Sequence, residues 1–234
     1  MSACVDLQRE VFALPEIEIS PVRHLIVTKN AGGFILGGYD GEMLVGFVLS
    51  VPAFLRGLPA FYSHMTAVKG THQSFGIGGR LKWAQRAKAL ELGVKFVKWT
   101  FEPWKARNAY FNLEKLGAIL SEYQPNFYGI DYATASTGGV PIGLASDRLF
   151  AEWHLESEKV VLLSKGEPYL ETREPLAEIA VTPDWATLVA TDTNAAIEEQ
   201  KHLKAEFEPA FERGLIGAGF RRDDTSPKYL LFSK

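Results

Sequence analysis

The stretch of sequence that decides the fold is Ala67-Val-Lys-Gly-Thr-His-Gln73-Ser-Phe-Gly76-Ile-Gly78-Gly79-Arg80-Leu81. It joins an apolar, strand-like run to a segment whose apolar residues have helical spacing. Glycines at such a junction let a ligand approach bare backbone, and the free N–H groups of a first helical turn attract anions. The stretch therefore indicates a phosphate-binding turn, unless its glycines only shape a tight connection between strand and helix.

Two common phosphate-binding motifs do not fit this stretch. A dinucleotide-binding fingerprint that started at Gly76 would need Gly or Ala at position 81, where the chain has Leu81, and an acidic residue about 20 residues further on. A Walker A loop needs Gly-Lys followed by Ser or Thr, whereas Gly79 is followed by Arg80. Neither motif supports nucleotide binding.

Upstream of this stretch, the sequence predicts one helix and three strands. Residues 3–14 have a helical apolar face that Pro15 ends. Strand-like runs cover residues 33–39, 43–51 and 60–68. Asp40-Gly41 lies between the first two runs, and Gly accepts the positive φ that a tight hairpin turn needs. The three strands are therefore expected to be antiparallel neighbours.

Downstream, helices alternate with strands. We expect a helix over residues 76–92 that ends at Gly93, a strand over 94–101, a helix over 105–116 that ends at Gly117, and a strand over 118–123. Alternating elements after a hairpin predict an α/β fold, in which a mixed α+β sheet carries helices on its faces.

The remaining chain is expected to form an extension. Residues 134–146 are rich in Gly and small residues and predict a linker between a domain at 1–133 and a C-terminal α/β extension at 147–234. In the extension we expect a helix at 149–155 that Ser146 or Asp147 caps. Strands are expected at 160–163 and 185–191, a helix at 194–213, and closing strands at 217–222 and 229–232.

Composition narrows the classes of partner. The 234 residues include 25 Lys+Arg and 28 Asp+Glu, a formal net charge of −3, so no basic surplus is present to neutralise nucleic acid. With 47% hydrophobic residues the chain is far from the composition of disorder. The longest apolar stretch, residues 43–55, is shorter than the roughly 20 residues that span a bilayer. Neither nucleic acid nor a membrane is an expected partner.

The N-terminus and the cysteine content indicate a reducing compartment. The first 15 residues lack the basic-then-apolar order of a signal peptide. Cys4 is the single cysteine and cannot form an internal disulfide. The histidines lack metal-ligand spacing, so no metal site is expected. We expect a cytoplasmic protein.

One family pattern fits the deciding stretch. Gln73-x-x-Gly76-x-Gly78, after a strand that ends with Ala67-Val68 and before an amphipathic helix, resembles the acyl-CoA binding motif Gln/Arg-x-x-Gly-x-Gly/Ala of the GNAT superfamily of N-acetyltransferases. The resemblance covers about residues 3–130 and includes Glu-Lys-Leu-Gly at 114–117. It implies an acyl-CoA N-acyltransferase-like fold, here with a C-terminal α/β extension. The whole chain also resembles a subgroup of predicted acetyltransferases, through the Arg-Asn-Ala…Leu-Gly-Ala run at 107–118 and through residues 146–149 with Trp153, and this subgroup implies no substrate.

The resemblance implies acetyl-CoA or another acyl-CoA as co-substrate. Its pyrophosphate would bind the backbone amides of residues 74–79, its pantetheine would run beside residues 65–68, and an amine would attack the thioester directly. The implied binding residues are Ala67, Val68, Gln73, Ser74, Phe75, Gly76, Ile77, Gly78 and Gly79. Asn108 is a further candidate contact, or only a helix cap.

Direct transfer needs a base that removes a proton from the amine. The resemblance places a carboxylate where this chain has Tyr62. Strand alternation puts Tyr62, His64 and Thr66 on one face, and a histidine ordinarily titrates near neutrality. His64 is therefore the preferred base and Glu102 the alternative, although either can be a residue without a catalytic role.

An acid would protonate the departing thiolate. The resemblance implies a tyrosine in this role, at the position where this chain has Leu113. Tyr110, nearly one turn earlier, is our candidate acid in its place. Tyr123 and Tyr128 are further candidates. A thiolate of low pKa can also leave without an acid.

Two further residues bear on the acceptor. Trp104 could line an acceptor pocket or pack in the core, and Arg148 could bind a carboxylate of the acceptor or pair with Glu152 four residues on. We expect a small-molecule or protein amine as acceptor, with the extension covering it or forming a homodimer interface. A non-catalytic acyl-CoA-binding module and a plain nucleotide-binding protein are the alternatives.

Overall fold

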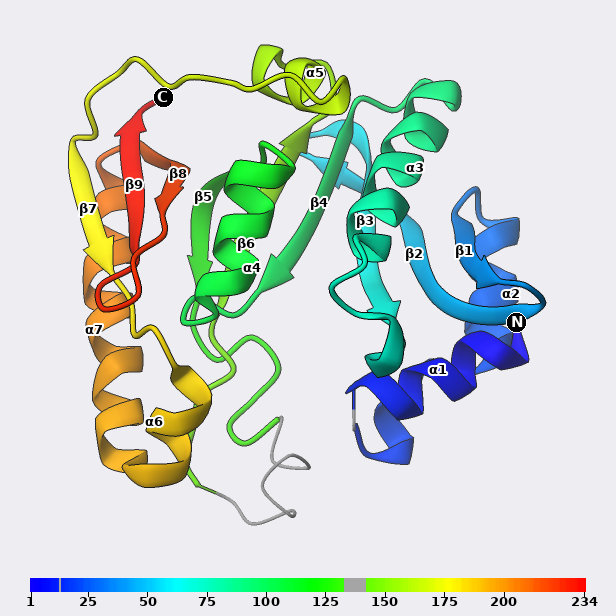
Figure 1. Ribbon diagram of the computed structural model, residues 1–234, viewed down its shortest axis with the longest axis horizontal. Coiled ribbons are helices and arrows are strands. Elements are labelled where there is room, and N and C mark those ends of the chain that lie inside the picture. The colour runs from blue at the N-terminus through cyan, green and yellow to red at the C-terminus, as the bar shows by residue number, and fades with distance from the viewer. Residues whose placement is uncertain (13, 133–141) are drawn as a thin grey trace. The chain divides into compact units, whose positions relative to one another are not determined.

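The computed structural model describes residues 1–12, 14–132 and 142–234. The chain divides into two compact units (Figure 1). Unit 1 comprises Met1–Trp99 and His154–Glu156, and unit 2 comprises Thr100–Trp153 and Ser157–Lys234. The linker predicted at 134–146 lies largely outside the described residues.

Unit 1 contains the predicted first helix and three strands. The helix is α1 (Ser2–Phe12), and the strands are β1 (Phe34–Asp40), β2 (Met43–Leu55) and β3 (Leu58–Val68). They are antiparallel neighbours, with Asp40 opposite Met43 across the predicted hairpin turn. The helix α3 (Ile77–Glu91) follows, and then β4 (Phe96–Phe101), which pairs with β3 in parallel.

A second helix of unit 1, α2 (Val22–Asn30), was missed by the sequence prediction. Its buried residues are Leu25 and Thr28, while Ile26 and Val27 are exposed. The helix thus lacks a continuous apolar stripe, and the residues 26–27 read as strand formers.

Helices cover both faces of the antiparallel strands. Phe47 and Leu49 of β2 join a core cluster with residues of α1 and α2. The alternate face carries α3, where a Cβ at Gly46 would lie 3.1 Å from Leu81 Cδ1 and 3.3 Å from Ile77 Cγ2. The predicted arrangement of a mixed sheet with helices on its faces is confirmed.

A buried lysine lies between α3 and the strands. Lys82 is 4% exposed, donates to Ser63 Oγ at 3.1 Å and to Gln85 Oε1 at 2.6 Å, and its Nζ lies 3.8 Å from the ring centroid of Trp99. Gln85 donates in turn to Ser50 Oγ at 2.7 Å. Burial lowers the pKa of Lys82 well below its usual range.

Unit 2 contains five strands in the order β6-β5-β8-β9-β7, each antiparallel to its neighbour. Their bounds are β5 (Ile119–Gln124), β6 (Arg148–His154), β7 (Ala177–Ala180), β8 (Leu215–Arg221) and β9 (Lys228–Ser233). The helices are α4 (Ala106–Tyr110), which continues as a π-type turn Phe111–Lys115, α5 (Glu158–Ser164), α6 (Trp185–Thr191) and α7 (Thr193–Glu212). The predictions of α7, β8 and β9 are confirmed, and the short strand β7 was missed.

The helix predicted at 149–155 is wrong, because this segment is strand β6. Ser146 and Asp147 do not cap a helix. The Ser146 hydroxyl accepts from Tyr128 N at 2.7 Å, and the Asp147 carboxylate accepts from Asn126 N at 2.7 Å. β6 is buried on both faces, so its sequence lacks the alternation that identifies a half-exposed strand.

The strands predicted at 160–163 and 185–191 are also wrong, because both segments are helices. Their apolar and β-branched residues favour strands locally, but tertiary packing and capping decide otherwise. α5 packs around Gly117, where a Cβ would lie 3.2 Å from Val160 Cγ2 and Leu163 Cδ1. α6 begins after Asp184, whose carboxylate accepts from Thr187 N at 3.0 Å as an N-cap.

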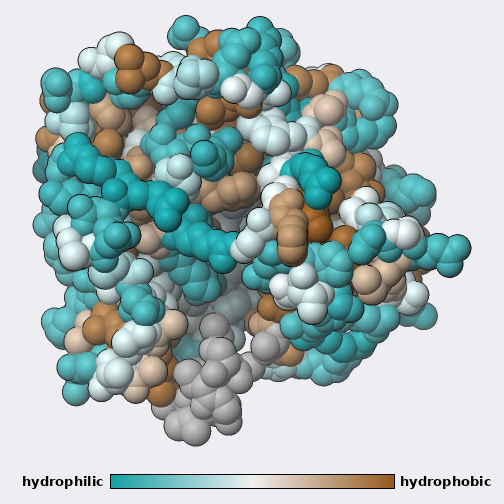
Figure 2. Space-filling view, in the orientation of Figure 1, coloured by the Kyte–Doolittle hydropathy of each residue, from teal (hydrophilic) through white to brown (hydrophobic). Residues whose placement is uncertain are grey.

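The surface has the polarity that the composition indicates. Hydrophilic residues cover most of the face in Figure 2. Across the described ranges, no helix combines the length and apolar character that crossing a bilayer requires.

The buried amine of Lys82 should make stability depend on pH. The folded chain holds the pKa of Lys82 below its usual range, so the unfolded chain binds more protons and the free energy of unfolding rises with pH. Relative to Lys82→Met, the natural chain should gain up to about 1.4 kcal/mol per pH unit between the two pKa values. Urea denaturation of both at pH 7, 8.5 and 10 measures this difference.

The control is Lys88→Met, on the same helix, where the lysine is partly exposed and pairs with Glu91. Its pH dependence should equal that of the natural chain. Equal slopes for Lys82→Met and the natural chain would contradict the account.

Candidate functional site

The loop between β3 and α3 contains two left-handed backbone positions. After β3 ends at Val68, a short turn Gly70–His72 leads to Ser74, whose φ is 69°. Gly76 has a φ of 75° and is the N-cap of α3. Glycine adopts positive φ without a steric cost, which explains a glycine where the loop turns into the helix.

Side chains hold this loop in place. Gln73 Nε2 donates to the carbonyl of Val68 at 3.2 Å and so closes the loop on itself. The ring of His72 lies 2.8 Å from Thr71 Oγ1 through Nδ1 and 3.3 Å from Asp40 Oδ2 through Nε2. The loop is thus attached both to the end of β3 and to the β1–β2 hairpin.

The loop presents unbonded amides. The N–H of Arg80 bonds back to the carbonyl of Gly76 at 3.0 Å. Within the described ranges, the N–H groups of residues 74–79 have no acceptor. A Cβ at Gly78 would meet only Val68 Cγ2, at 3.9 Å. Free amides at the start of a 15-residue helix, with open space beside them, can bind an anion.

The edge of β3 next to this loop is sparsely paired. The parallel register of β3 and β4 comprises Phe61 opposite Val97 and Tyr62 opposite Lys98. β3 then continues to Val68 with β2 on its other side. An extended ligand could therefore lie along this edge and end at the loop.

His64 stands at a β-bulge. The register of β3 against β2 places Ser63 opposite Ser50 and Met65 opposite Leu49, so His64 is one extra residue on β3. A bulge re-aims the side chain it inserts and commonly lies beside a functional site.

The bulge corrects the expected alternation. We expected Tyr62, His64 and Thr66 on one face, but Met65 and Ala67 pack into the core cluster with α1 and α2. His64 lies on the same side of the strand, where it contacts Ser20 and His24. The extra residue reverses the alternation after His64, and Thr66 falls on the other face.

Two residues that sequence reasoning missed surround His64. Ser20 Oγ lies 3.4 Å from His64 Nε2, and the ring of His24 packs edge-on with a centroid distance of 5.7 Å. His64 is exposed, yet the protein atoms around it partly desolvate the ring, and this burial together with the charge of His24 lowers the pKa of His64. The imidazole is therefore neutral at pH 7.

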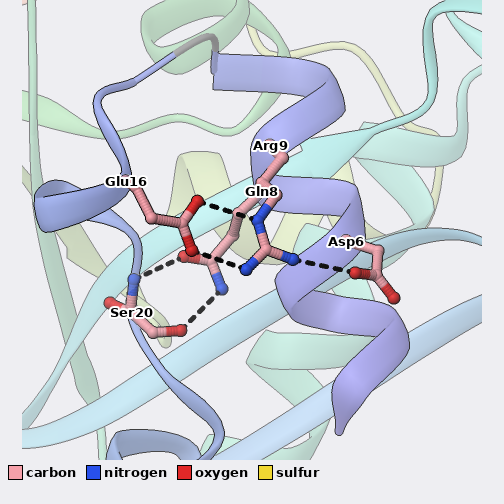
Figure 3. A network of polar contacts seen from close by, with 5 residues as sticks. All are labelled: Asp6, Gln8, Arg9, Glu16 and Ser20. Atoms are coloured by element: carbon pink, nitrogen blue, oxygen red, sulfur yellow. Dashed lines mark hydrogen bonds and ion pairs between the residues drawn. The ribbon is translucent and has the colours of Figure 1, made fainter.

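The helix α1 fixes the position of Ser20 (Figure 3). Gln8 is buried and its amide bonds to both backbone groups of Ser20, at 2.9 Å and 3.2 Å. Arg9 forks onto Glu16 at 2.7 Å and 3.0 Å and also bonds Asp6. The Gln8–Ser20 contact joins residues 12 apart in sequence, and no local pattern predicts it.

Unit 2 contains a cavity of about 640 Å³ that brings together three residues considered from the sequence. Glu102, Trp104 and Arg148 all line it. Glu102 forms an ion pair with Lys105. Trp104 is buried and stacks on Trp185 with a centroid distance of 4.6 Å.

Arg148 does not pair with Glu152. In a strand, residues four apart are separated by about 13 Å, and Glu152 instead accepts from Ser121 Oγ at 2.5 Å. Arg148 is 8% exposed, donates to the carbonyl of Asp147 at 2.9 Å, and lies 5.1 Å from the ring centroid of Tyr128.

The remaining candidates on α4 lie in different surroundings. Tyr110 lines a second cavity of about 500 Å³, with Arg222 4.9 Å and Lys115 5.4 Å from its ring centroid. Asn108 is exposed, and Lys105 rather than Asn108 occupies the N-cap of α4, so the capping alternative is wrong. Leu113 is fully buried.

The other two tyrosines offer no better acid. Tyr123 donates to Asp147 Oδ2 at 2.5 Å, and burial with this contact raises its pKa far above the usual range. Tyr128 stacks on Tyr132. Among the described residues, no three His, Cys, Asp or Glu side chains gather as a metal site would need.

Comparison with known proteins identifies the fold. No family model and no curated protein matches the chain. An N-acetyltransferase from Staphylococcus aureus Mu50 matches with a TM-score of 0.52 at 12% identity, over 66% of this chain and 92% of that one. Aminoglycoside 6′-acetyltransferase type Ii matches with 0.50 at 16% identity, over 67% and 90%. A protein from Desulfovibrio desulfuricans, assigned to the GNAT family, matches with 0.50 at 12% identity, over 66% and 91%.

These matches confirm the acyl-CoA N-acyltransferase-like fold that the resemblance implied. At such low identity they establish the fold of the chain, and the activity is argued from its residues.

The surroundings of His64 predict its titration. Because desolvation and His24 disfavour the imidazolium, the NMR titration midpoint of His64 should lie below the ordinary 6.5. In His24→Ala the midpoint should rise but stay below 6.5, because desolvation is the larger cause. His202→Ala, on the exposed side of α7, is the control and should leave it unchanged. A midpoint at or above 6.5 in the natural chain would refute this assignment.

Proposed function

We propose that this protein transfers an acyl group from acyl-CoA to an amine. The observation that carries the proposal is the run of unbonded amides at residues 74–79, which follows β3 and opens α3 within an acyltransferase fold. The sequence there has the acyl-CoA motif that starts at Gln73. On this proposal the chain is a GNAT enzyme.

The loop would hold the pyrophosphate of the CoA moiety. The amides from Ser74 to Gly79 would donate to its oxygens, and Gly78 leaves room for them. Gln73 would keep the loop closed through its bond to Val68. The pantetheine would lie along the β3 edge that ends at Ala67 and Val68.

His64 would act as the base. Its lowered pKa keeps the imidazole neutral at pH 7, so the ring can accept a proton as the amine attacks. The amine nitrogen forms a bond to the thioester carbon, the carbon–sulfur bond breaks, and the thiolate leaves with the electron pair. Gln8 and Ser20 would act as positioning residues for the ring. Glu102 is the alternative base and Tyr110 the candidate acid.

A second candidate function is a non-catalytic acyl-CoA-binding module. Leu113 fills the position where the resemblance implies a tyrosine, and it is fully buried. Tyr62 replaces the implied carboxylate. Binding of CoA without turnover of any amine would favour this module.

Acceptor, location and assembly remain predictions. A small-molecule or protein amine is the expected acceptor, and the C-terminal extension would cover it or form a homodimer interface. The domain boundary near residue 133 and the cytoplasmic location likewise remain predictions.

Blocking the amides should abolish CoA binding. Gly78→Glu places a carboxylate where the pyrophosphate would lie, while the space around the Cβ leaves the fold intact. The Kd for CoA in calorimetry should rise at least 100-fold with an unchanged melting temperature. Ala84→Glu adds the same charge at an exposed position of α3 and should bind normally. If ATP or NAD, but not CoA, raises the melting temperature of the natural chain, the nucleotide-binding alternative replaces the proposal.

Removing the base should reduce turnover rather than binding. With acetyl-CoA and a panel of amines, thiol release by His64→Ala should be slower by about 10²–10⁴-fold, the usual contribution of a general base. The Kd for CoA should be unchanged. A large loss in Glu102→Gln with none in His64→Ala would assign the base to Glu102.

A further inference from the structure

The cavity of unit 2 has the dimensions and walls of a small-molecule site. Its volume of about 640 Å³ falls in the range that holds drug-sized ligands. Much of its wall is apolar and comes from segments far apart in sequence. The apolar lining residues include Trp104, Leu144, Ala145, Trp185, Val189 and Ala190.

Two of the four charged residues in the wall, Asp131 and Arg148, lack a charged partner within the described part of the chain. Glu102 and Lys105 neutralise one another. Asp131 accepts from the backbone N–H groups of Ile142 and Gly143, both at 2.9 Å. Across the described ranges, Arg148 has only a backbone carbonyl and a ring as partners.

The guanidinium of Arg148 has donors to spare. It carries five N–H groups in a fixed fork, and the Asp147 carbonyl takes one at 2.9 Å. Among the described residues, the buried side-chain polar atom without a hydrogen-bond partner is Trp104 Nε1. The other guanidinium nitrogens are thus not sealed off, although the residue is 8% exposed. Holding an arginine this deeply without a counter-charge is costly, and a ligand carboxylate would supply one.

The ligand body would contact aromatic rings. Trp104 and Trp185 stack at a centroid distance of 4.6 Å and an interplanar angle of 23°. Tyr128, under Arg148, stacks on Tyr132, which also lines the cavity. Such walls favour a flat or apolar ligand body.

We propose that this cavity binds a small aromatic or apolar carboxylate, with Arg148 as the bidentate partner of the carboxylate. Glu102, the alternative base, lines the same cavity. If the protein transfers an acyl group to an amine, as proposed above, the acceptor would be an apolar carboxylate that also carries an amine. This part of the inference rests on the proposed function.

The binding test compares two probes with the same phenylpropyl skeleton, one an anionic carboxylate and the other a neutral amide. Calorimetry with 3-phenylpropionate and 3-phenylpropanamide should show at least tenfold tighter binding of the carboxylate. In Arg148→Met the preference should fall below about threefold. Arg213→Met, which removes an exposed cation at the end of α7, should keep the full preference. Equal binding of both probes, or a preference that survives in Arg148→Met, overturns the proposal.

A second variant covers the case in which Arg148→Met does not fold. Ala190 is exposed on α6 and lines the cavity, so Ala190→Trp should fill the space without disturbing the core. Loss of 3-phenylpropionate binding with a preserved melting temperature supports the site, and unchanged binding refutes it.

Turnover separates the two proposals. With acetyl-CoA, L-phenylalanine should be acetylated faster than 2-phenylethylamine, which lacks the carboxylate. Carboxylate binding that depends on Arg148, without acetylation of any amine, supports the cavity and counts against the proposed function. Acetylation of amines that does not depend on a carboxylate supports the proposed function and counts against the carboxylate site in the cavity.

Discussion

Close packing between the start of α3 and the β1–β2 hairpin is the constraint on which the candidate site depends. A Cβ at Gly46 would lie 3.0 Å from the carbonyl oxygen of Ala67 and 3.1 Å from Leu81 Cδ1. Glycine at this position lets the helix approach the strands closely enough that its first turn stands over the end of β3. The amides of residues 74–79 lie where α3 begins, and a helix start leaves its first N–H groups without intrahelical partners.

Local sequence signals correctly predicted the elements whose turns and helix ends are marked by glycine. Asp40-Gly41 marked the hairpin, and Gly93 and Gly117 ended their helices at positive φ. The segments that misled are those whose partners decide their state. β6 is buried on both faces and has no alternation, and α5 carries a β-branched run that packs around Gly117. Propensity is a weak guide where tertiary contacts dominate.

The candidate site divides in the same way. The loop and its glycines could be predicted because the residues of the motif, from Gln73 to Gly78, are contiguous in sequence. The bulge at His64 was not, since a register shift depends on the neighbouring strand. Neither was the contact with Ser20, which Gln8 fixes from 12 residues away. The cavity around Arg148 draws on segments separated by up to about a hundred residues, so the sequence offered its members only as separate hypotheses.

The low net charge bears on both candidate anion sites, the loop before α3 and the cavity around Arg148. A formal net charge of −3 provides no bulk field that would attract an anion. An anionic ligand must then be held by donors at fixed positions. In unit 1 these are the amides that begin α3, and in unit 2 the guanidinium of Arg148 is held against a backbone carbonyl. Neutral amides cannot lose their capacity to donate with pH, and a guanidinium stays protonated. Across the neutral range, the loop amides and the guanidinium should therefore hold an anion without a pH dependence of their own, and any pH dependence of transfer should come from the titration of the attacking amine and of the base that accepts its proton.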